Sequence, residues 1–243
     1  MVYDLTKFTN KLTNKHILKL AQACMDIGYF PSVFKKTLTI VLRKPNKPDY
    51  TKPNAYRPIA LENTIGKVLE SITTELLSYL IETHELLPAN HFGARLQRTT
   101  EDAMIVLTEH IYRAWKQQEI FTVVFMDVAG AFNNVHHKRL THNMKMRRIP
   151  SHLVKLVQSF LTERTTQMRF NGTTSSNISI EAGIPQGSPL SPILFMIYNA
   201  ELLEITKALD LALGFIDNIA YGVSGQTAQQ NIEQLQVTLQ SKP

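Results

Sequence analysis

Apolar side chains recur at helical spacing in several stretches of the chain, with polar residues between them. This spacing predicts amphipathic helices, because it gathers the apolar positions on one helix face. The helices are expected over residues 12–27, 65–80, 99–117, 135–148, 150–163, 189–206 and 226–240. We expect Gly28 to end the first helix and Thr99 or Thr100 to cap the third. The helix from Pro189 to Thr206 is apolar enough to be buried.

Short runs rich in β-branched and aromatic residues predict strands between these helices. The strands are expected over residues 37–42, 123–126, 165–170, 177–181, 211–215 and 219–223. Asn171-Gly172 is a strong signal for a two-strand turn, and Asp217-Asn218 joins the last two runs into a second hairpin. Because helices and strands mix without a regular alternation, we expect the α+β class.

The run from Val123 to Met126 is expected to be a buried strand, and it ends on the carboxylate of Asp127. Burying a charged carboxylate is unfavourable unless a cationic group meets it. Two interpretations of Asp127 are open at this point. It either caps the turn that follows or belongs to a site that binds a cation.

Length and composition exclude several classes of protein. A chain of 243 residues can bury a substantial core, as one large domain or two sub-domains. Its one cysteine, Cys24, excludes an intrachain disulfide and a cysteine-based zinc site. The N-terminus lacks the apolar region of a signal peptide, and the apolar stretch Ile193–Tyr198 is too short to span a bilayer. We therefore expect an intracellular protein of the nucleus or cytoplasm, not secreted and without a membrane segment.

The net charge of +6 is unevenly distributed. Residues 1–57 hold eleven Lys and Arg against three Asp and Glu, and the remaining chain is slightly acidic. A basic excess at one end of the chain is what a phosphate-binding surface needs. The alternative is an ordinary solvated face of a globular protein.

Two unusual stretches follow Asp127, in a fixed order: Gly183-Ile184-Pro185-Gln186-Gly187-Ser188-Pro189-Leu190-Ser191-Pro192 and Phe215-Ile216-Asp217-Asn218. With the strand ending at Asp127, they resemble the three central palm motifs of reverse transcriptases, above all those of non-LTR (LINE-type) retrotransposons. Further pieces of the resemblance stand in order along residues 30–240: Pro31 to Phe34, Arg43-Lys44 with Lys47 and Asp49, Tyr56 to Ile59, Gly66-Lys67 with Glu70, and His91-Phe92-Gly93. Several pieces in the correct order make a chance match improbable.

The resemblance implies a two-metal site. Two carboxylates from separate strands can hold two divalent cations about 3.5–4 Å apart, which clamp the attacking and leaving oxygens of a phosphoryl transfer. Asp127 and Asp217 would ligate two Mg²⁺ ions, for which Mn²⁺ can substitute, and the carbonyl of Val128 would add an oxygen. Asn218 stands at the third catalytic position. The motifs imply the pairing of Asp127 with Asp217. Spacing alone cannot show it, because about ninety residues separate the two.

The resemblance also implies positions for the substrates. Lys44, Lys47 and Arg57 would hold the triphosphate of a dNTP, and Phe132 would lie under its sugar and exclude a 2′-hydroxyl. Gln186 would contact the incoming nucleotide, while the residues expected beside the template and primer are Gly183, Pro185, Gly187 and Ser188. The alternatives are a core aromatic for Phe132, surface charge for Lys47 and a turn glycine for Gly187.

His136 and His137 are an adjacent pair that could suggest a metal site. Adjacent histidines point apart on a helix, so a helix start with a solvated pair is the favoured interpretation.

The chain departs from the family pattern at two carboxylates. Reverse transcriptases usually have two adjacent aspartates at the hairpin, whereas the second is Asn218 here, and Asn133 replaces another common aspartate. Loss of the charge at Asn218 should weaken metal binding. Both changes are Asp to Asn, which suggests the hypothesis of a decaying copy of the element. The family also continues beyond the last predicted helix into a thumb, so we expect a chain with the thumb missing.

We therefore predict an α+β, right-hand polymerase fold, with fingers over residues 1–120 and 149–181 and a palm over 121–148 and 182–243. The predicted function is RNA-directed DNA synthesis, with an RNA template, a DNA primer and dNTP as partners. Two alternatives remain: a non-catalytic nucleic-acid-binding remnant, and another palm enzyme such as an intron maturase or an RNA-dependent RNA polymerase. Phe132 argues against RNA synthesis.

Overall fold

The computed structural model describes residues 11–204 and 209–240, and they form two compact units. Unit 1 comprises Met1–Leu76 and Phe132–Ser191, and unit 2 comprises Leu77–Ala131 and Pro192–Pro243. These units have boundaries of their own, and the fingers and palm ranges given above remain a prediction.

Unit 1 is built on a sheet whose strands are β1 (Lys36–Arg43), β2 (Tyr56–Leu61), β4 (Arg164–Phe170), β5 (Thr173–Thr174) and β6 (Ile178–Ile180). β1 pairs antiparallel with β2 and parallel with β4. β4 pairs antiparallel with both β5 and β6. The helical elements are α1 (Lys11–Ile27), η2 (Ser32–Phe34), η3 (Pro53–Ala55), α4 (His137–Met146), α5 (Ser151–Leu161) and the first part of α2 (Thr64–Thr83).

The core of unit 1 forms around the apolar face of α5. Leu153, Val157 and Phe160 are fully buried there. The ring of Phe30 packs edge-on against Phe160, with 5.1 Å between ring centroids. The predicted Asn171-Gly172 turn is confirmed: both residues have positive φ (46° and 81°), as a tight two-residue hairpin turn requires.

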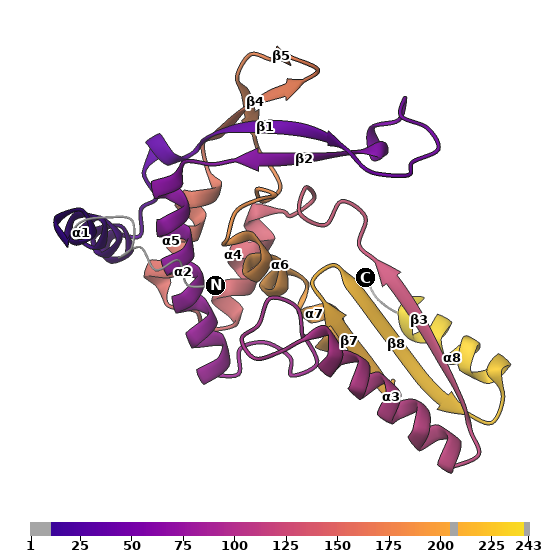
Figure 1. The fold of residues 1–243 in the computed structure, drawn as a ribbon. Helices are drawn as coiled ribbons and strands as arrows, with labels where there is room; N and C mark the ends of the chain where they lie inside the picture. Colours follow the sequence, from indigo (N-terminus) through magenta and orange to yellow (C-terminus); the bar gives the residue numbers. More distant parts are fainter. Residues whose placement is uncertain (1–10, 205–208, 241–243) are drawn as a thin grey trace. The chain divides into compact units, whose positions relative to one another are not determined.

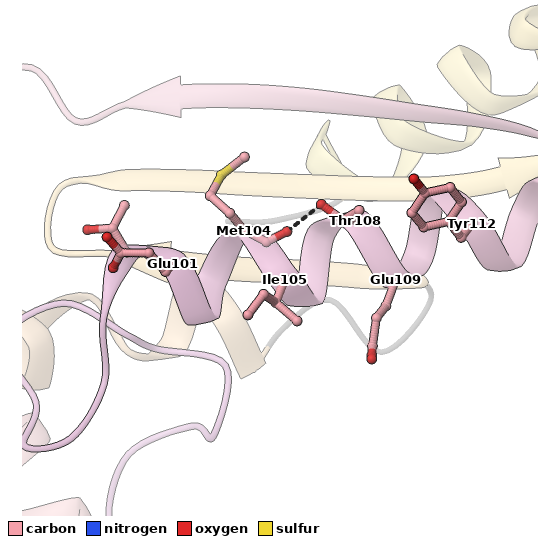
Figure 2. A pocket seen from close by; sticks show the side chains of 7 residues that line it. Glu101, Met104, Ile105, Thr108, Glu109 and Tyr112 are labelled. Atoms are coloured by element: carbon pink, nitrogen blue, oxygen red, sulfur yellow. Dashed lines mark hydrogen bonds between the residues drawn. The ribbon is translucent and has the colours of Figure 1, made fainter.

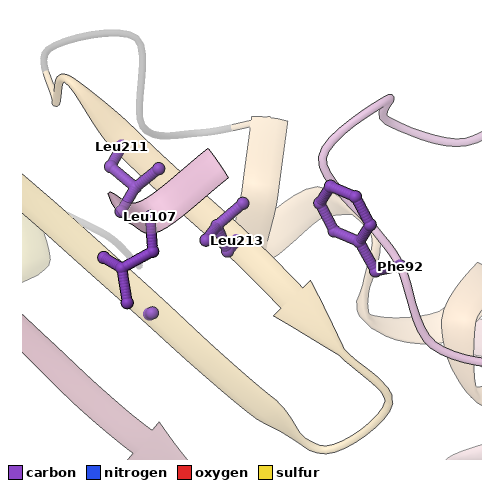
Figure 3. Packing of buried hydrophobic residues seen from close by; sticks show 5 residues of the cluster. Phe92, Leu107, Leu211 and Leu213 are labelled. Atoms are coloured by element: carbon purple, nitrogen blue, oxygen red, sulfur yellow. The ribbon is translucent and has the colours of Figure 1, made fainter. Parts of the chain in front are cut away.

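Unit 2 contains a three-stranded antiparallel sheet in the order β3 (Ile120–Asp127), β8 (Asn218–Gly225) and β7 (Leu211–Phe215). Helix α3 (Thr100–Lys116) covers one face, where Leu107 packs with Phe92, Leu211 and Leu213 (Figure 3). Helices α7 (Glu201–Glu204) and α8 (Ala228–Gln240) cover the other face. That second cluster contains Leu203, Ile219, Tyr221, Val223 and Leu235. The hairpin β7–β8 is thus held by packing on both faces.

The prediction that the Asp127 strand is buried was wrong. β3 is an edge strand of its sheet, and only Phe121, Val123 and Val124 pack into the clusters. Phe125 is 68% exposed and Met126 is 40% exposed. Asp127 is exposed as well, so no cost of burial forces a cation onto it. A metal-binding role for Asp127 must therefore be argued from the other ligand groups near it.

The predicted helix 189–206 is two helices. α6 (Ser191–Asn199) is buried as expected, and it is separated from α7 at Ala200. Residues 205 and 206 lie outside the described residues. The other predicted helices are confirmed to within a few residues, and the helices predicted over 135–148 and 150–163 are the shorter α4 and α5. Thr99 caps α3 in a reciprocal arrangement with Asp102. Within the described ranges, no helix is long and apolar enough to cross a bilayer.

Candidate active site

Two carboxylates lie at the same end of the unit 2 sheet. β3 ends at Asp127, which is opposite Asn218, the first residue of β8. The next backbone contact continues the ladder, because Val128 N donates to Asp217 O at 3.0 Å. β3 ends next to the turn that joins β7 to β8 (Figure 1). Asp127, the last residue of β3, and Asp217, in that turn, therefore lie at the same end of the sheet. The structure brings these two predicted ligands together although ninety residues of sequence separate them.

Asp217 sits in a strained turn. Phe215 pairs with Asn218, which leaves Ile216 and Asp217 as the two loop residues of the hairpin. Ile216 has φ of +56°, in the left-handed region that β-branched residues normally avoid. Such a conformation costs about 1–3 kcal/mol and persists only where the surroundings hold it. The residue before a candidate catalytic carboxylate is thus held in an unfavourable conformation.

The donor set at this end of the sheet is sparse. The side-chain amide of Asn218 donates to Asp217 Oδ1 at 3.3 Å, and the Val128 carbonyl accepts from Ala131 N at 3.2 Å. No group of three or more His, Cys, Asp or Glu side chains suited to a metal occurs in the described part of the chain. Mg²⁺ often takes only one or two carboxylates and fills its shell with water and substrate phosphate. Two carboxylates and a carbonyl therefore fit Mg²⁺, with one charge fewer than Asp at position 218 would give.

The glycine-rich stretch of unit 1 is a loop fastened to the residues after β3. Gly183 N donates to Val135 O at 2.9 Å, and Ile184 N donates to Phe132 O at 2.8 Å. Gly183 has φ of +83°, and a Cβ there would lie 2.7 Å from Asn133 O. This close approach therefore needs glycine at position 183. The hydrogen bond from Ile184 joins the half-buried Phe132 to the loop.

The same loop crosses β2. Ala60 N donates to Gln186 O at 2.8 Å, and Gly187, with φ of +123°, lies so close to Ala60 O that a Cβ would be 2.7 Å away. Gln186 is thereby held beside Ala60 of β2, and Ala60 lies three residues after Arg57 in the sequence. A cavity in unit 1 is lined by Gly183, Pro185 and Gln186 of the loop together with Thr37, Thr39, Pro58, Ala60, Asn133 and Arg164.

The predicted phosphate-binding residues gather at one end of the hairpin β1–β2. Arg57 is exposed and pairs with Leu42, while Lys44 and Lys47 lie in the loop that follows β1. Tyr50 donates its hydroxyl hydrogen to Lys44 O at 2.8 Å, which holds this loop. Lys47 is exposed, so the interpretation as surface charge and the interpretation as a phosphate ligand both stay open for it.

Ser188 faces the protein interior. It is 5% exposed, its hydroxyl donates to the carboxylate of Glu70, and its oxygen accepts from Leu190 N at 3.1 Å. This arrangement favours a role in holding the loop over direct contact with a template or primer. The predicted contact with the template and primer stays a prediction for Gly183, Pro185 and Gly187.

A buried charge cluster beneath Ser188 was missed by the sequence reasoning. The carboxylates of Glu62 and Glu70 are fully buried, and Arg164, 1% exposed, is ion-paired with Glu62. Burial, followed by the nearby charge of Glu62, raises the pKa of Glu70 to about 8. The Glu70 carboxyl group is therefore expected to keep its proton at neutral pH. No local pattern shows this cluster, because 94 residues separate Glu70 from Arg164.

His137 does not match the prediction of a solvated pair. It is the first residue of α4, it is half-buried, and its Nε2 lies 2.7 Å from Gly183 O, to which it donates. His136 is exposed. His137 thus fixes the start of the glycine-rich loop, a contact that sequence spacing alone does not show.

The candidate residues divide between the units. Asp127, Val128, Asp217 and Asn218 belong to unit 2, whereas Phe132, the basic hairpin and the glycine-rich loop belong to unit 1. Unit 2 also carries a pocket along α3, lined by Glu101, Met104, Ile105, Tyr112 and their neighbours (Figure 2). None of the predicted site residues lines that pocket.

Residues 42–242 match the family described as reverse transcriptase (RNA-dependent DNA polymerase). The RNA-directed DNA polymerase from mobile element jockey of Drosophila melanogaster is 33% identical over 187 residues, covering 77% of this chain and 20% of that protein. A probable RNA-directed DNA polymerase from transposon BS of the same species is 29% identical over 187 residues, with the same 77% and 20% coverage. The chain therefore spans about a fifth of the length of these relatives.

Solved structures share the fold. The apo telomerase of Candida tropicalis truncated from its C-terminal domain matches with a TM-score of 0.60 and 11% identity, covering 95% of this chain and 51% of that one. The apo telomerase of the same species matches with a TM-score of 0.57 and 10% identity, covering 94% and 46%. At such low identity the likeness is one of fold.

Proposed function

Because the chain belongs to the reverse transcriptase (RNA-dependent DNA polymerase) family, we propose that it carries the catalytic centre of an RNA-directed DNA polymerase of a non-LTR retrotransposon. In this proposal a DNA primer is extended on an RNA template from dNTP, inside the cell. The observation that carries the proposal is the juxtaposition of Asp127 and Asp217 at neighbouring strand ends, joined by the Val128–Asp217 backbone hydrogen bond.

The proposed reaction joins the primer to one nucleotide. The primer 3′-oxygen forms a bond to the α-phosphorus of the dNTP, loses its proton to solvent, and the bond to the β-phosphate oxygen breaks to release pyrophosphate. When bound, two Mg²⁺ ions supply charge stabilisation at the attacking and leaving oxygens. Asp127, Asp217 and the Val128 carbonyl would hold them.

The residues of unit 1 have supporting roles in the proposal. Arg57, Lys44 and Lys47 bind the triphosphate, since guanidinium and ammonium groups both suit phosphate oxygens. Phe132 lies under the sugar, and the loop that contains Gln186 presents its backbone to the nucleotide and the primer–template pair. Glycines 183 and 187 suit that role, because their backbone already makes close approaches to other main-chain atoms.

We also propose that the fold is of the right-hand type, with fingers over residues 1–120 and 149–181 and a palm over 121–148 and 182–243. The support is the place of the motifs: Asp127 and the β7–β8 hairpin share one sheet, as the palm motifs of the family require.

The test is primer extension on an RNA template with Mg²⁺ or Mn²⁺. The parent chain is compared with Asn218→Asp, and with Asn218→Asp combined with Asp127→Asn. We expect incorporation by Asn218→Asp and a loss of at least ~100-fold when Asp127 is also changed, because a site without one carboxylate stabilises the transition state less. Incorporation that survives Asp127→Asn would contradict the site, and a folded Asn218→Asp chain without any incorporation would contradict the activity.

A non-catalytic nucleic-acid-binding protein is a second candidate function. One observation that favours it is Asn218, whose amide occupies an oxygen of Asp217. Another is the basic end of the hairpin β1–β2, where one acidic residue, Asp49, stands among four basic ones: Lys44, Lys47, Lys52 and Arg57. This candidate predicts RNA binding that weakens steeply with salt, with no incorporation by the parent chain.

A further inference from the structure

We propose that His91 and Asn199 are positioning residues that orient the Ile216–Asp217 peptide, so that the Asp217 carboxylate is presented for metal binding. The inference rests on the proposed function, because it assigns the support of the same carboxylate. Neither residue belongs to the three motifs that suggested the site, and neither is proposed to touch the metals or the substrates.

The contact with the turn is made by Asn199, at the end of α6. Asn199 is 6% exposed, and its Nδ2 donates to Ile216 O at 2.8 Å. This carbonyl belongs to the central peptide of the two-residue hairpin loop, whose N–H is that of Asp217. One side-chain amide therefore fixes the plane of the peptide from which the candidate catalytic carboxylate projects.

His91 fixes the orientation of that amide. His91 Nε2 lies 3.2 Å from Asn199 Oδ1, and the imidazole is fully buried. Because Asn199 uses its NH2 group on a carbonyl, its oxygen faces the imidazole, and His91 Nε2 must carry the hydrogen. The relay runs in one direction, from His91 through Asn199 to Ile216 O.

The segment that carries His91 is laid along β7. Phe92 N donates to Gly214 O at 2.7 Å, and Gly214 N donates to Asn90 O at 3.0 Å. These two bonds act as a short parallel bridge at His91, directly before the turn. The relay therefore starts from a backbone that is itself hydrogen-bonded to the hairpin.

Gly93 closes the arrangement on the strained residue. A Cβ at Gly93 would lie 2.5 Å from Ile216 Cγ1 and 2.6 Å from Ile216 N. Only glycine permits this approach, and it packs main chain against the residue whose φ is +56°. Two contacts thus hold Ile216 in its positive-φ conformation. Gly93 packs against its backbone, and Asn199 donates a hydrogen bond to its carbonyl oxygen.

Arg95 anchors the segment to α2. Its Nε and one terminal nitrogen donate to the two carboxylate oxygens of Glu82 at 2.7 and 2.8 Å, and its other terminal nitrogen donates to Pro88 O at 2.7 Å and His91 O at 3.3 Å. The guanidinium lowers the pKa of Glu82, so this pair is ionised at neutral pH. The support extends from a helix to the turn by consecutive contacts.

The main test is Asn199→Asp, which keeps the shape of the side chain and replaces the donor to Ile216 O by a second acceptor. Asn231→Asp is the matched control. Asn231 is also buried, and its amide donates to Ile120 O at 2.7 Å and Thr122 Oγ1 at 3.1 Å at the opposite end of β3. Both variants lose a buried amide that donates from a helix to a main-chain carbonyl of unit 2, but only Asn199 contacts the turn of Asp217.

The measurement is Mn²⁺ affinity by electron paramagnetic resonance, made in the Asn218→Asp chain and independent of turnover, with folding followed by circular dichroism. We expect Asn199→Asp to weaken Mn²⁺ binding at least ~10-fold and Asn231→Asp to change it less than ~2-fold. Equal loss in the two variants, or unchanged affinity in Asn199→Asp, would overturn the proposal.

A second pair of variants covers a failure of Asn199→Asp to fold. His91→Gln keeps a side-chain N–H donor that can reach Asn199 Oδ1, and His91→Leu removes it. We expect His91→Gln to retain most of the Mn²⁺ affinity and His91→Leu to lose it as Asn199→Asp does. Equal affinity in these two variants would also overturn the proposal.

The outcomes separate this inference from the proposed function. If Asp127→Asn leaves Mn²⁺ binding of the Asn218→Asp chain unchanged, the metal site itself is wrong. If Asp127→Asn abolishes binding while the changes at His91 and Asn199 leave it intact, the site stands and only the positioning role fails.

Discussion

Asn218 lies directly opposite Asp127 in the antiparallel pair β3–β8, and its side-chain amide donates to Asp217 Oδ1 at 3.3 Å. A neutral amide therefore occupies an oxygen of one candidate metal ligand, and its residue lies at the register position opposite the other. An acid at this position would add a negative charge and free the Asp217 oxygen for a cation. The identity of residue 218 is thus expected to set the metal affinity of the site.

Asn218→Asp should strengthen Mn²⁺ and Mg²⁺ binding by ~10-fold or more, since carboxylate charge contributes much of the affinity of such sites. Titration of the parent and the variant with Mn²⁺ at one ionic strength checks this expectation. Asn133→Asp makes the same chemical change at a position in unit 1 and serves as the comparison. Equal affinity in parent and Asn218→Asp would show that residue 218 is not part of the site.

Phe132 is half-buried, and its main-chain oxygen is held by Ile184 N. If its ring excludes a 2′-hydroxyl, Phe132→Ala should raise incorporation of ribonucleotides relative to deoxynucleotides by ~10-fold or more, because the steric conflict disappears. Competition between rNTP and dNTP in primer extension measures the ratio. Phe125→Ala, at an aromatic that is 68% exposed, serves as control. An unchanged ratio in Phe132→Ala would support the core-aromatic interpretation.

Glu70 should make stability depend on pH. Burial raises the pKa of Glu70 to about 8, whereas an unfolded chain releases this proton near the ordinary value of 4.5. Between these values unfolding releases a proton, so the free energy of unfolding falls as pH rises, on the order of 3 kcal/mol from pH 5 to pH 8. Glu70→Gln should remove this slope, which urea unfolding at several pH values measures.

Glu82→Gln is the matched control for that experiment. The Arg95 guanidinium lowers the pKa of Glu82, so the stability that Glu82 contributes is present above the ordinary carboxyl pKa and is lost as pH falls below it. Its removal should therefore leave the slope between pH 5 and pH 8 unchanged. A slope that persists in Glu70→Gln would mean that Glu70 is not the group that binds the proton.

Gly187→Ala should destabilise the chain by about 2 kcal/mol, because the new Cβ would lie 2.7 Å from Ala60 O and the backbone φ is +123°. Gly172→Ala is the matched control, since Gly172 also has positive φ, at +81°, but no atom lies within 4 Å of the added Cβ. It should cost about 1 kcal/mol, from the backbone conformation alone. Unfolding midpoints measure the difference, and equal losses would mean that the contact with β2 is unimportant.

The sequence by itself determined most of the helices and strands and the family. Local signals were sufficient for the cap of α3 at Thr99, the end of α1 before Gly28 and the turn at Asn171-Gly172, because each depends on neighbouring residues. The order of the motifs then predicted that Asp127 and Asp217 belong together, which their adjacent strand ends support.

Tertiary structure decided which side chains are covered and which distant groups meet. The apolar run before Asp127 predicted a buried strand, but its exposure depends on β3 being the edge of the sheet, which periodicity does not encode. Ser188 donates a hydrogen bond to Glu70, which is 118 positions away in the sequence. His91, Asn199 and Ile216 are likewise distant in sequence and joined by hydrogen bonds. Such contacts arise from packing of whole elements, so they become visible only when the chain is folded.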